Sequence, residues 1–285
     1  MTGRNGSMRL LAVTACLIFV AAASAASATA LASPDQVEIP SKGGTLRAEL
    51  YKPDGVGPFP TVIGLHGCAG LSDHSDPVLP RYRAWAEQLV KNGNAVLLPD
   101  SYGSRGLGSQ CRVKKRRLAV LRKRVADIQA ARQWLMQQTW VKHDRISLLG
   151  WANGASAVLW AVRPQLLWHN AGPDFRTAIA LYPDCRLSAG LGWAARVPTL
   201  LLIGAKDNIS SPPACRRMIE GARGRSALVR LVVFPGAYHD FDGAKLSLHV
   251  VKRGVKVRKP PRRPLGSDIR ARLDAQKLVV QWLSR

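Results

Sequence analysis

The sequence predicts an α/β domain whose core is a mostly parallel, eight-stranded sheet with helices on both faces. Short apolar runs alternate with longer stretches of helical periodicity, which is the pattern of parallel strands joined by crossover helices. Several runs, such as Thr199–Ile203, are apolar almost throughout, as strands buried on both faces are. The chain has 285 residues and is 47% hydrophobic, so we expect a single domain with a full core.

Eight segments have the length and composition of strands. Each has four to seven residues, is rich in apolar side chains and ends near a turn-forming residue. They are Gln36–Ile39, Thr45–Tyr51, Thr61–Leu65, Ala95–Leu98, Arg145–Leu149, Ala178–Leu181, Thr199–Ile203 and Leu228–Phe234.

Two stretches show clear helical periodicity. Apolar residues recur at three- and four-residue steps over Lys115–Gln138, which predicts that its basic residues lie on the opposite, solvent-facing side. A similar apolar stripe predicts a last helix over Ser267–Leu283. Between them, Lys252–Pro264 contains three prolines and no periodicity, so we expect an exposed loop there.

The first 32 residues resemble a secretory signal peptide, so we do not expect them to be part of the fold. Arg4 and Arg9 precede an apolar run, and small residues with A-x-A sites follow it. We therefore expect cleavage after Ala30 or Ala32, an exported protein (periplasmic or secreted), and one domain over residues 33–285. A membrane anchor and a lipoprotein signal ending at Cys16 are the alternative interpretations of the same stretch.

Loss of the leader removes Cys16 and leaves four cysteines. These are Cys68, Cys111, Cys185 and Cys215. In an oxidising compartment four cysteines predict two disulfides, for which three connectivities exist; four buried free thiols are the alternative. Since no group of His and Cys has the spacing of a zinc site, we expect no metal.

The chain is strongly basic. Its net charge is +24, of which the leader's two arginines account for little, and the excess is concentrated in residues 112–124 and 252–263. Such charge favours anionic partners, and an anionic envelope polymer is the candidate. Aromatic residues do not interleave with the basic ones, so a nucleic-acid partner is not expected. We expect both groups to be solvated surface.

Three features in a fixed order carry the chemistry. The segment Gly150–Gly154 follows a predicted strand and has the frame of a nucleophile elbow, G-x-S-x-G, with Ala152 in the nucleophile's position. Asp207 follows the strand Thr199–Ile203, and His239 follows the next strand. Elbow, acid and histidine occur in this order in α/β-hydrolases.

Several short motifs together resemble the dienelactone hydrolase family, in particular its exported members. They are His66-Gly67-Cys68, Pro99-Asp100-Ser101, Gly103–Gly108, Tyr182-Pro183 and Pro235–Phe241. The resemblance covers residues 35–285 and implies the α/β-hydrolase fold, with hydrolysis of esters or lactones by a Cys or Ser nucleophile and no metal or organic cofactor. Ala152 departs from that pattern.

The fold that the resemblance implies has a usual strand order, which bears on the cysteines. In that order the strands before Cys68 and Cys111 are neighbours, and so are those before Cys185 and Cys215. The implied disulfides are therefore 68–111 and 185–215.

The expected roles follow from the chemistry of acyl transfer. His239 would be the general base, Asp207 would orient its ring, and the backbone N–H groups of Cys68 and Asn153 would form the oxyanion hole. Three other acids compete with Asp207 for its role: Asp174, Asp184 and Asp240.

Three further residues near the predicted site carry a hydroxyl, thiol or imidazole. We expect His66 to be a structural, hydrogen-bonding residue. Ser156 lies one helical turn beyond Ala152 and cannot replace the nucleophile. Cys68 is chemically able to do so, but a disulfide is its better use.

Together these features predict an ester or lactone hydrolase by descent, with acyl-enzyme chemistry disabled at Ala152. The expected ligand is a small ester, lactone or carboxylate. The alternative of a different class is a non-catalytic, small-ligand-binding protein of the cell envelope that uses the old pocket. A third is a basic envelope or nucleic-acid-associated protein for which the fold is only a scaffold.

Overall fold

The computed structural model describes residues 1–3, 34–113, 117–164, 172–243 and 268–285. Contacts between residues divide the chain into Met1–Leu31 and Ala32–Arg285, and all the helices and strands named below belong to the second unit. The expected leader and the expected loop Lys252–Pro264 lie outside the described residues.

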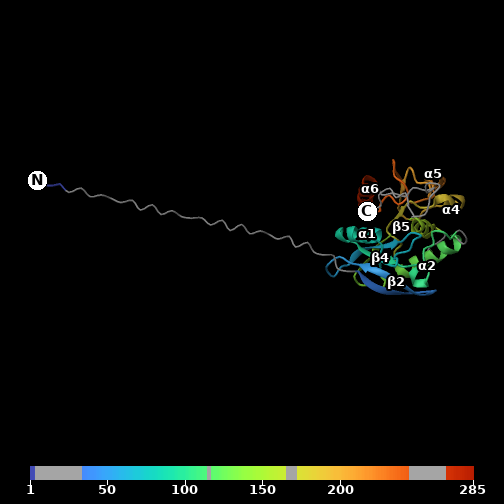
Figure 1. The fold of residues 1–285 in the computed structure, drawn as a ribbon, viewed down its shortest axis with the longest axis horizontal. Helices are drawn as coiled ribbons and strands as arrows, with labels where there is room; N and C mark the ends of the chain where they lie inside the picture. Colours follow the sequence, from blue (N-terminus) through green and yellow to red (C-terminus); the bar gives the residue numbers. More distant parts are fainter. Residues whose placement is uncertain (4–33, 114–116, 165–171, 244–267) are drawn as a thin grey trace, which may run out of the picture. The chain divides into compact units, whose positions relative to one another are not determined.

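The predicted mostly parallel, eight-stranded sheet is confirmed (Figure 1). The strand order is β1-β2-β4-β3-β5-β6-β7-β8. All pairs from β4 to β8 in this order are parallel, whereas β1 and β2 add an antiparallel edge. The strands are β1 (Asp35–Ser41), β2 (Gly44–Tyr51), β3 (Phe59–Leu65), β4 (Ala95–Pro99), β5 (Val141–Trp151), β6 (Ala178–Leu181), β7 (Thr199–Gly204) and β8 (Val229–Phe234).

Several strands extend beyond their expected bounds, and β5 (Val141–Trp151) does so most. β5 begins at Val141, whereas the sequence predicts a start at Arg145. Val141 pairs with Phe59 of β3, and the register shifts before Thr61 pairs with Ile146. The irregularity lets a polar stretch join the sheet ahead of its buried apolar part.

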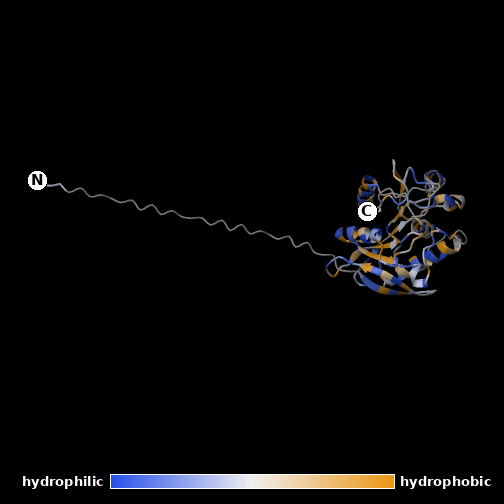
Figure 2. Ribbon diagram, viewed as in Figure 1, coloured by the Kyte–Doolittle hydropathy of each residue, from blue (hydrophilic) through white to orange (hydrophobic). Residues whose placement is uncertain are grey.

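Helices cover both sides of the sheet. They are α1 (Pro80–Lys91), α2 (Arg117–Leu135), α3 (Asn153–Ala161), α4 (Cys185–Gly190), α5 (Pro212–Gly221) and α6 (Ile269–Leu283), with a 3-10 turn η1 at Gly103–Arg105. Figure 1 shows α1 and α6 on one side of the sheet and α2, α4 and α5 on the other. In Figure 2 the hydrophobic segments follow the central strands and the hydrophilic ones the outer helix surfaces. None of the helices in the described ranges has the length and hydrophobicity needed to cross a bilayer.

The basic side of α2 differs from its expected solvated state. Lys123 is exposed, but Arg124 is only 1% exposed and Arg132 only 4%. The Arg124 guanidinium lies 5.2 Å from the Tyr102 ring and that of Arg132 lies 5.8 Å from the Phe175 ring. The expectation is wrong for these two arginines because α2 packs against both α3 and the sheet, and long side chains pack against aromatic rings there.

Both implied cysteine pairs are joined in the structure. The bridge between Cys68 and Cys111 ties the loop after β3 to the segment after η1, where the Gln110 N–H also donates to the Cys68 carbonyl at 2.8 Å. The bridge between Cys185 and Cys215 joins α4 to α5. The bridges close loops of 43 and 30 residues in sequence separation. Each therefore restricts the unfolded chain over a long segment.

Removal of one bridge gives the first expected result. Replacing Cys185 and Cys215 together by alanine should lower the free energy of unfolding in urea by about 2–4 kcal/mol, because the unfolded chain gains freedom. Mass spectrometry of the unreduced protein after alkylation should find none of the four cysteines modified. Alkylation of all four in the folded protein would contradict both bridges.

Candidate active site

Ala152 lies at the tip of a sharp turn between β5 and α3. Its φ is 48° and its ψ is −108°, a conformation that a residue with a side chain rarely adopts. The two flanking glycines allow this turn: a Cβ on Gly150 would lie 2.6 Å from the Gly154 backbone, and one on Gly154 would lie 1.9 Å from the Leu65 carbonyl oxygen. The turn has the geometry that exposes a nucleophile above the sheet, and in this chain it carries a methyl group.

Asp207 and His239 form a buried pair. The distance between His239 Nδ1 and Asp207 Oδ2 is 2.8 Å, and the two residues are only 5% and 6% exposed. The other carboxylate oxygen of Asp207 accepts the backbone N–H groups of Ile209 and Ser210 at 2.9 and 2.8 Å. Because an ionised carboxylate can only accept hydrogen bonds, we assign the ring proton to His239 Nδ1, which donates it to Asp207. Nε2 is then the ring atom left for proton transfer.

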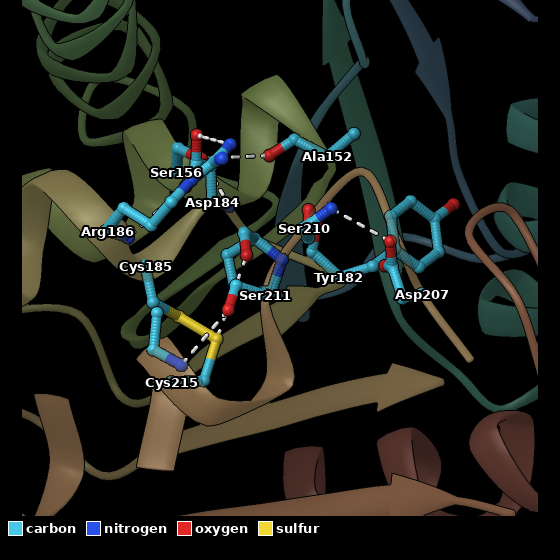
Figure 3. The surroundings of a disulfide bond; sticks show 12 residues. Ala152, Ser156, Tyr182, Asp184, Cys185, Arg186, Asp207, Ser210, Ser211 and Cys215 are labelled. Atoms are coloured by element: carbon cyan, nitrogen blue, oxygen red, sulfur yellow. Dashed lines mark hydrogen bonds and ion pairs between the residues drawn. A yellow bond between two sulfur atoms is a disulfide. The ribbon is translucent and has the colours of Figure 1, made fainter. Parts of the chain in front are cut away.

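The elbow and the histidine both follow parallel strands and lie at the carboxyl edge of the sheet. The Ala152 N–H donates to the Leu181 carbonyl at 3.0 Å, one residue before Tyr182. The Tyr182 ring lies 4.6 Å from the His239 ring, between centroids. Figure 3 shows Ala152, Tyr182 and Asp207 in the same region of the molecule. The expected nucleophile position, acid and base are thus brought to one edge.

The two expected oxyanion donors lie beside the elbow. Asn153 is the first residue of α3, so its N–H has no acceptor within the helix. Cys68 follows Gly67, and a Cβ on Gly67 would lie 3.7 Å from the Ala152 methyl, so this loop passes the tip of the turn. The loop is held in place because the Gly67 N–H donates to the Tyr82 hydroxyl at 2.8 Å.

His66 has a structural place, as its sequence context indicates. It is fully buried, its Nδ1 lies 2.8 Å from the Gly67 carbonyl oxygen, and its Nε2 accepts the Ser101 N–H at 3.2 Å. Burial and, next, the charge of Arg124 hold the pKa of His66 well below its usual range. The ring is therefore neutral and fixes the oxyanion loop against the segment after β4.

The three acids that compete with Asp207 are engaged elsewhere. Asp174, Asp184 and Asp240 each form an ion pair with an arginine, at nitrogen–oxygen distances of 2.6, 2.7 and 2.6 Å. Asp184 is also the N-cap of α4. Of the four acids, Asp207 is the one with a carboxylate oxygen on His239 Nδ1.

Ser156 lies in the first turns of α3 and its hydroxyl is occupied (Figure 3). The hydroxyl donates to the Ala152 carbonyl at 3.2 Å and accepts the Asp184 N–H at 3.0 Å. It therefore ties the elbow to the start of α4 and does not face the tip of the turn as a second nucleophile.

Sequence reasoning missed the role of Asp242, a carboxylate that is 2% exposed and contacts residues next to the candidate site. Its Oδ2 accepts the indole N–H groups of Trp85 and Trp151 at 2.7 and 3.0 Å, and its Oδ1 accepts the Tyr182 hydroxyl at 2.7 Å. The sequence shows two acids after His239, Asp240 and Asp242, but no spacing indicates which of them is buried.

A cavity of about 150 Å³ lies on the β1–β2 side of the oxyanion loop, and it is not the candidate site. Its lining consists of Gln36, Arg47, Ala48, Glu49, Leu71, Ser72, Pro77 and Asp100. Burial raises the pKa of Glu49 in this cavity. Ala152, Asp207 and His239 are not among the lining residues, so the cavity offers no base beside a reacting centre.

In the described part of the chain, no group of three or more His, Cys, Asp or Glu residues could hold a metal ion.

Solved structures with the same fold cover most of this chain. A dienelactone hydrolase-like promiscuous phosphotriesterase from metagenomic libraries has a TM-score of 0.68 and 15% identity, over 88% of this chain and 97% of that one. Esterase 2 of Thermogutta terrifontis, phosphorylated by paraoxon, has a TM-score of 0.63 and 16% identity, over 89% and 94%. Dienelactone hydrolase from Anabaena variabilis has a TM-score of 0.57 and 20% identity, over 89% and 98%.

The sequence itself gives the family. No curated protein matches it. A model of the dienelactone hydrolase family matches residues 46–285, from the second strand to the end of the chain. Since this match covers most of its length, the chain belongs to the dienelactone hydrolase family.

Proposed function

We propose that this protein is an exported member of the family in which hydrolysis of esters or lactones through an acyl-enzyme is disabled. The observation that carries the proposal is the methyl group of Ala152 at a strained elbow tip, beside a buried His239–Asp207 pair with a 2.8 Å contact. Acyl transfer needs an oxygen or sulfur atom that attacks the carbonyl carbon while His239 takes its proton. A methyl group has neither a lone pair nor a transferable proton.

The remaining groups support a weak reaction with water. His239 Nε2 can remove a proton from a water molecule as its oxygen attacks the carbonyl carbon, and then return that proton to the leaving alkoxide. The N–H groups of Cys68 and Asn153 stabilise the negative charge that develops on the carbonyl oxygen. Loss of the nucleophile alone costs a serine hydrolase about 10⁶-fold in kcat, and the rest of the site keeps roughly 10³–10⁴-fold over water.

The native protein should therefore hydrolyse short activated esters only slowly. Its rate should exceed that of the uncatalysed reaction in water by roughly 10³–10⁴-fold. A fluorophosphonate should leave no covalent adduct that intact-protein mass spectrometry can detect. The slow rate should fall to background in His239→Ala, because the water then has no base. A native rate equal to that of an ordinary esterase would sink the proposal and direct attention to Cys68 as a nucleophile.

A second candidate is a non-catalytic protein that binds a small carboxylate or ester in the same site. Two oxyanion donors and a histidine beside an inert methyl group favour it, since a carboxylate oxygen can occupy the position of an oxyanion without reacting. The net charge of +24 supports an additional association with an anionic envelope polymer.

Export predicts a specific processed form. The protein recovered from the cell envelope or medium should begin between Leu31 and Pro34, because the peptidase cuts after small residues that follow an apolar run. N-terminal sequencing measures this directly. An intact Met1, or a lipid on Cys16, would contradict it.

A further inference from the structure

Asp242 is a buried carboxylate to which the chemistry above gives no role. Its three hydrogen-bond donors come from three different elements: Trp85 from α1, Trp151 from the end of β5, and Tyr182 from the residue after β6. Arg81 of α1 adds a positive charge, with its Nε 3.7 Å from Asp242 Oδ1. Buried carboxylates are stable only when paired and hydrogen-bonded, and Asp242 meets both conditions.

Two of these partners adjoin the candidate site. Trp151 directly precedes Ala152, so its indole fixes the last residue before the elbow tip. Tyr182 contacts the imidazole of His239, with 4.6 Å between ring centroids (Figure 3 shows Tyr182 beside Ala152). Asp242 itself follows His239 by three residues. The Asp242 carboxylate therefore connects three parts of the site: the elbow through Trp151, the Tyr182 ring that contacts His239, and the loop that carries His239.

The loop between His239 and Asp242 is fixed at each step. Asp240 has a φ of 63° and bonds to Arg81 at 2.6 Å, and the Gly243 N–H closes a turn onto the Asp240 carbonyl at 3.1 Å. Phe241 is fully buried, and its ring lies 5.0 Å from that of Phe234. A displacement of Asp242 is therefore transmitted to His239, since the chain between them has little freedom.

We infer that Asp242 is a positioning residue: it sets the place and orientation of the His239 imidazole relative to the elbow tip at Ala152. The inference rests on the proposed function, since it assigns Asp242 to the same site. A general base acts only within hydrogen-bonding reach of the proton that it removes, and misplacement by about 1 Å costs up to about a hundredfold in rate. A carboxylate shared by the two halves of the site controls that distance.

The first experiment uses Ala152→Ser as the active background. Adding Asp242→Asn should lower kcat for a short activated ester by about ten- to a hundredfold with little change in KM. The reason is that the amide NH₂ group of asparagine cannot accept the hydrogen bonds that one carboxylate oxygen of Asp242 accepts. The matched control is Asp127→Asn. Asp127 is also buried, at 1% exposure, and pairs at 2.6 Å with Arg105, which belongs to neither the elbow nor the histidine loop. The Ala152→Ser protein that also carries Asp127→Asn should be less stable than Ala152→Ser alone but should have the same kcat.

A second pair of variants covers the case in which Asp242→Asn does not fold. Trp151→Phe and Trp85→Phe each remove one indole donor from the same oxygen of Asp242, but only Trp151 adjoins the elbow. Trp151→Phe should lower kcat by at least about tenfold more than Trp85→Phe at similar thermal stability. Equal losses of kcat that follow the losses of stability would overturn the inference and leave Asp242 a purely structural residue.

The native protein gives a readout that needs no ester turnover. With ¹⁵N-labelled histidine, NMR reports the Nδ1 proton of His239 and its exchange with water. In folded Asp242→Asn this exchange should be at least about tenfold faster than in native protein and in Asp127→Asn. Unchanged His239 signals in folded Asp242→Asn would refute the positioning role. If Ala152→Ser is inactive but these signals move, the proposed function fails and the positioning of His239 by Asp242 stands.

Discussion

Placing a serine at position 152 should raise the rate of hydrolysis of short activated esters by at least about a hundredfold over the native protein. The expectation is a cautious fraction of what a nucleophile contributes in serine hydrolases. The elbow backbone already has the required conformation, with φ at 48°, so Ala152→Ser adds one oxygen without moving the chain. His239 Nδ1 lies 2.8 Å from Asp207 Oδ2, and in the proposed mechanism His239 takes the hydroxyl proton.

Steady-state kinetics on p-nitrophenyl acetate and intact-protein mass spectrometry after fluorophosphonate treatment measure this gain. The variant should gain one covalent adduct, and both the adduct and the rate should disappear on addition of His239→Ala. Ala69→Ser is the matched control, since it adds the same hydroxyl at an exposed position next to Cys68 and not at the elbow tip itself. That control should resemble the native protein.

A folded Ala152→Ser variant without rate gain and without adduct would mean that the pocket or the oxyanion hole is no longer formed. The non-catalytic binding protein would then be the better description. Titration of native protein with short carboxylic acids would measure that binding directly.

The second large effect is on stability. Gly154→Ala should lower the free energy of unfolding by on the order of 4 kcal/mol or more, because its new Cβ would lie 1.9 Å from the Leu65 carbonyl oxygen. An alanine in a helix normally stabilises by up to about 1 kcal/mol relative to glycine, so the expected sign is the reverse of the usual one. The clash involves backbone of β3 and cannot be relieved by a rotamer change.

Urea denaturation of both proteins measures this difference, and Gly190→Ala supplies the control. Gly190 is also helical, in α4, but a Cβ there has no atom within 4 Å. It should be neutral or slightly stabilising. A Gly154→Ala protein as stable as the native one would show that the elbow is packed less closely than described, and would weaken the case that its strain persists.

Much of the sheet was predictable because buried parallel strands are marked by continuous apolar runs. Thr199–Ile203 is predicted and β7 is Thr199–Gly204. The first part of β5 was not predictable, since Lys142 and Asp144 interrupt the apolar pattern and pairing at Val141 depends on a register shift. The burial of Arg124 was not predictable either, because periodicity divides a helix into faces but does not say what else packs on the second face.

The candidate site shows the same limit. The elbow, Asp207 and His239 could be predicted because each follows a strand in a characteristic order, and strand ends meet at one edge. The hydrogen bonds of Asp242 join residues 60, 91 and 157 positions apart, and such contacts leave no local pattern in the sequence. Local patterns therefore indicated the candidate site residues, whereas the hydrogen bonds that support them could be identified only from the fold.

The backbone at Ala152 has an evolutionary consequence. A residue with a side chain at a positive φ carries a cost of about 1–3 kcal/mol, which glycine would avoid. The chain nevertheless holds alanine there, and alanine and serine codons differ by a single base. One point mutation would therefore place a hydroxyl on a turn whose backbone already has the positive φ of a nucleophile elbow.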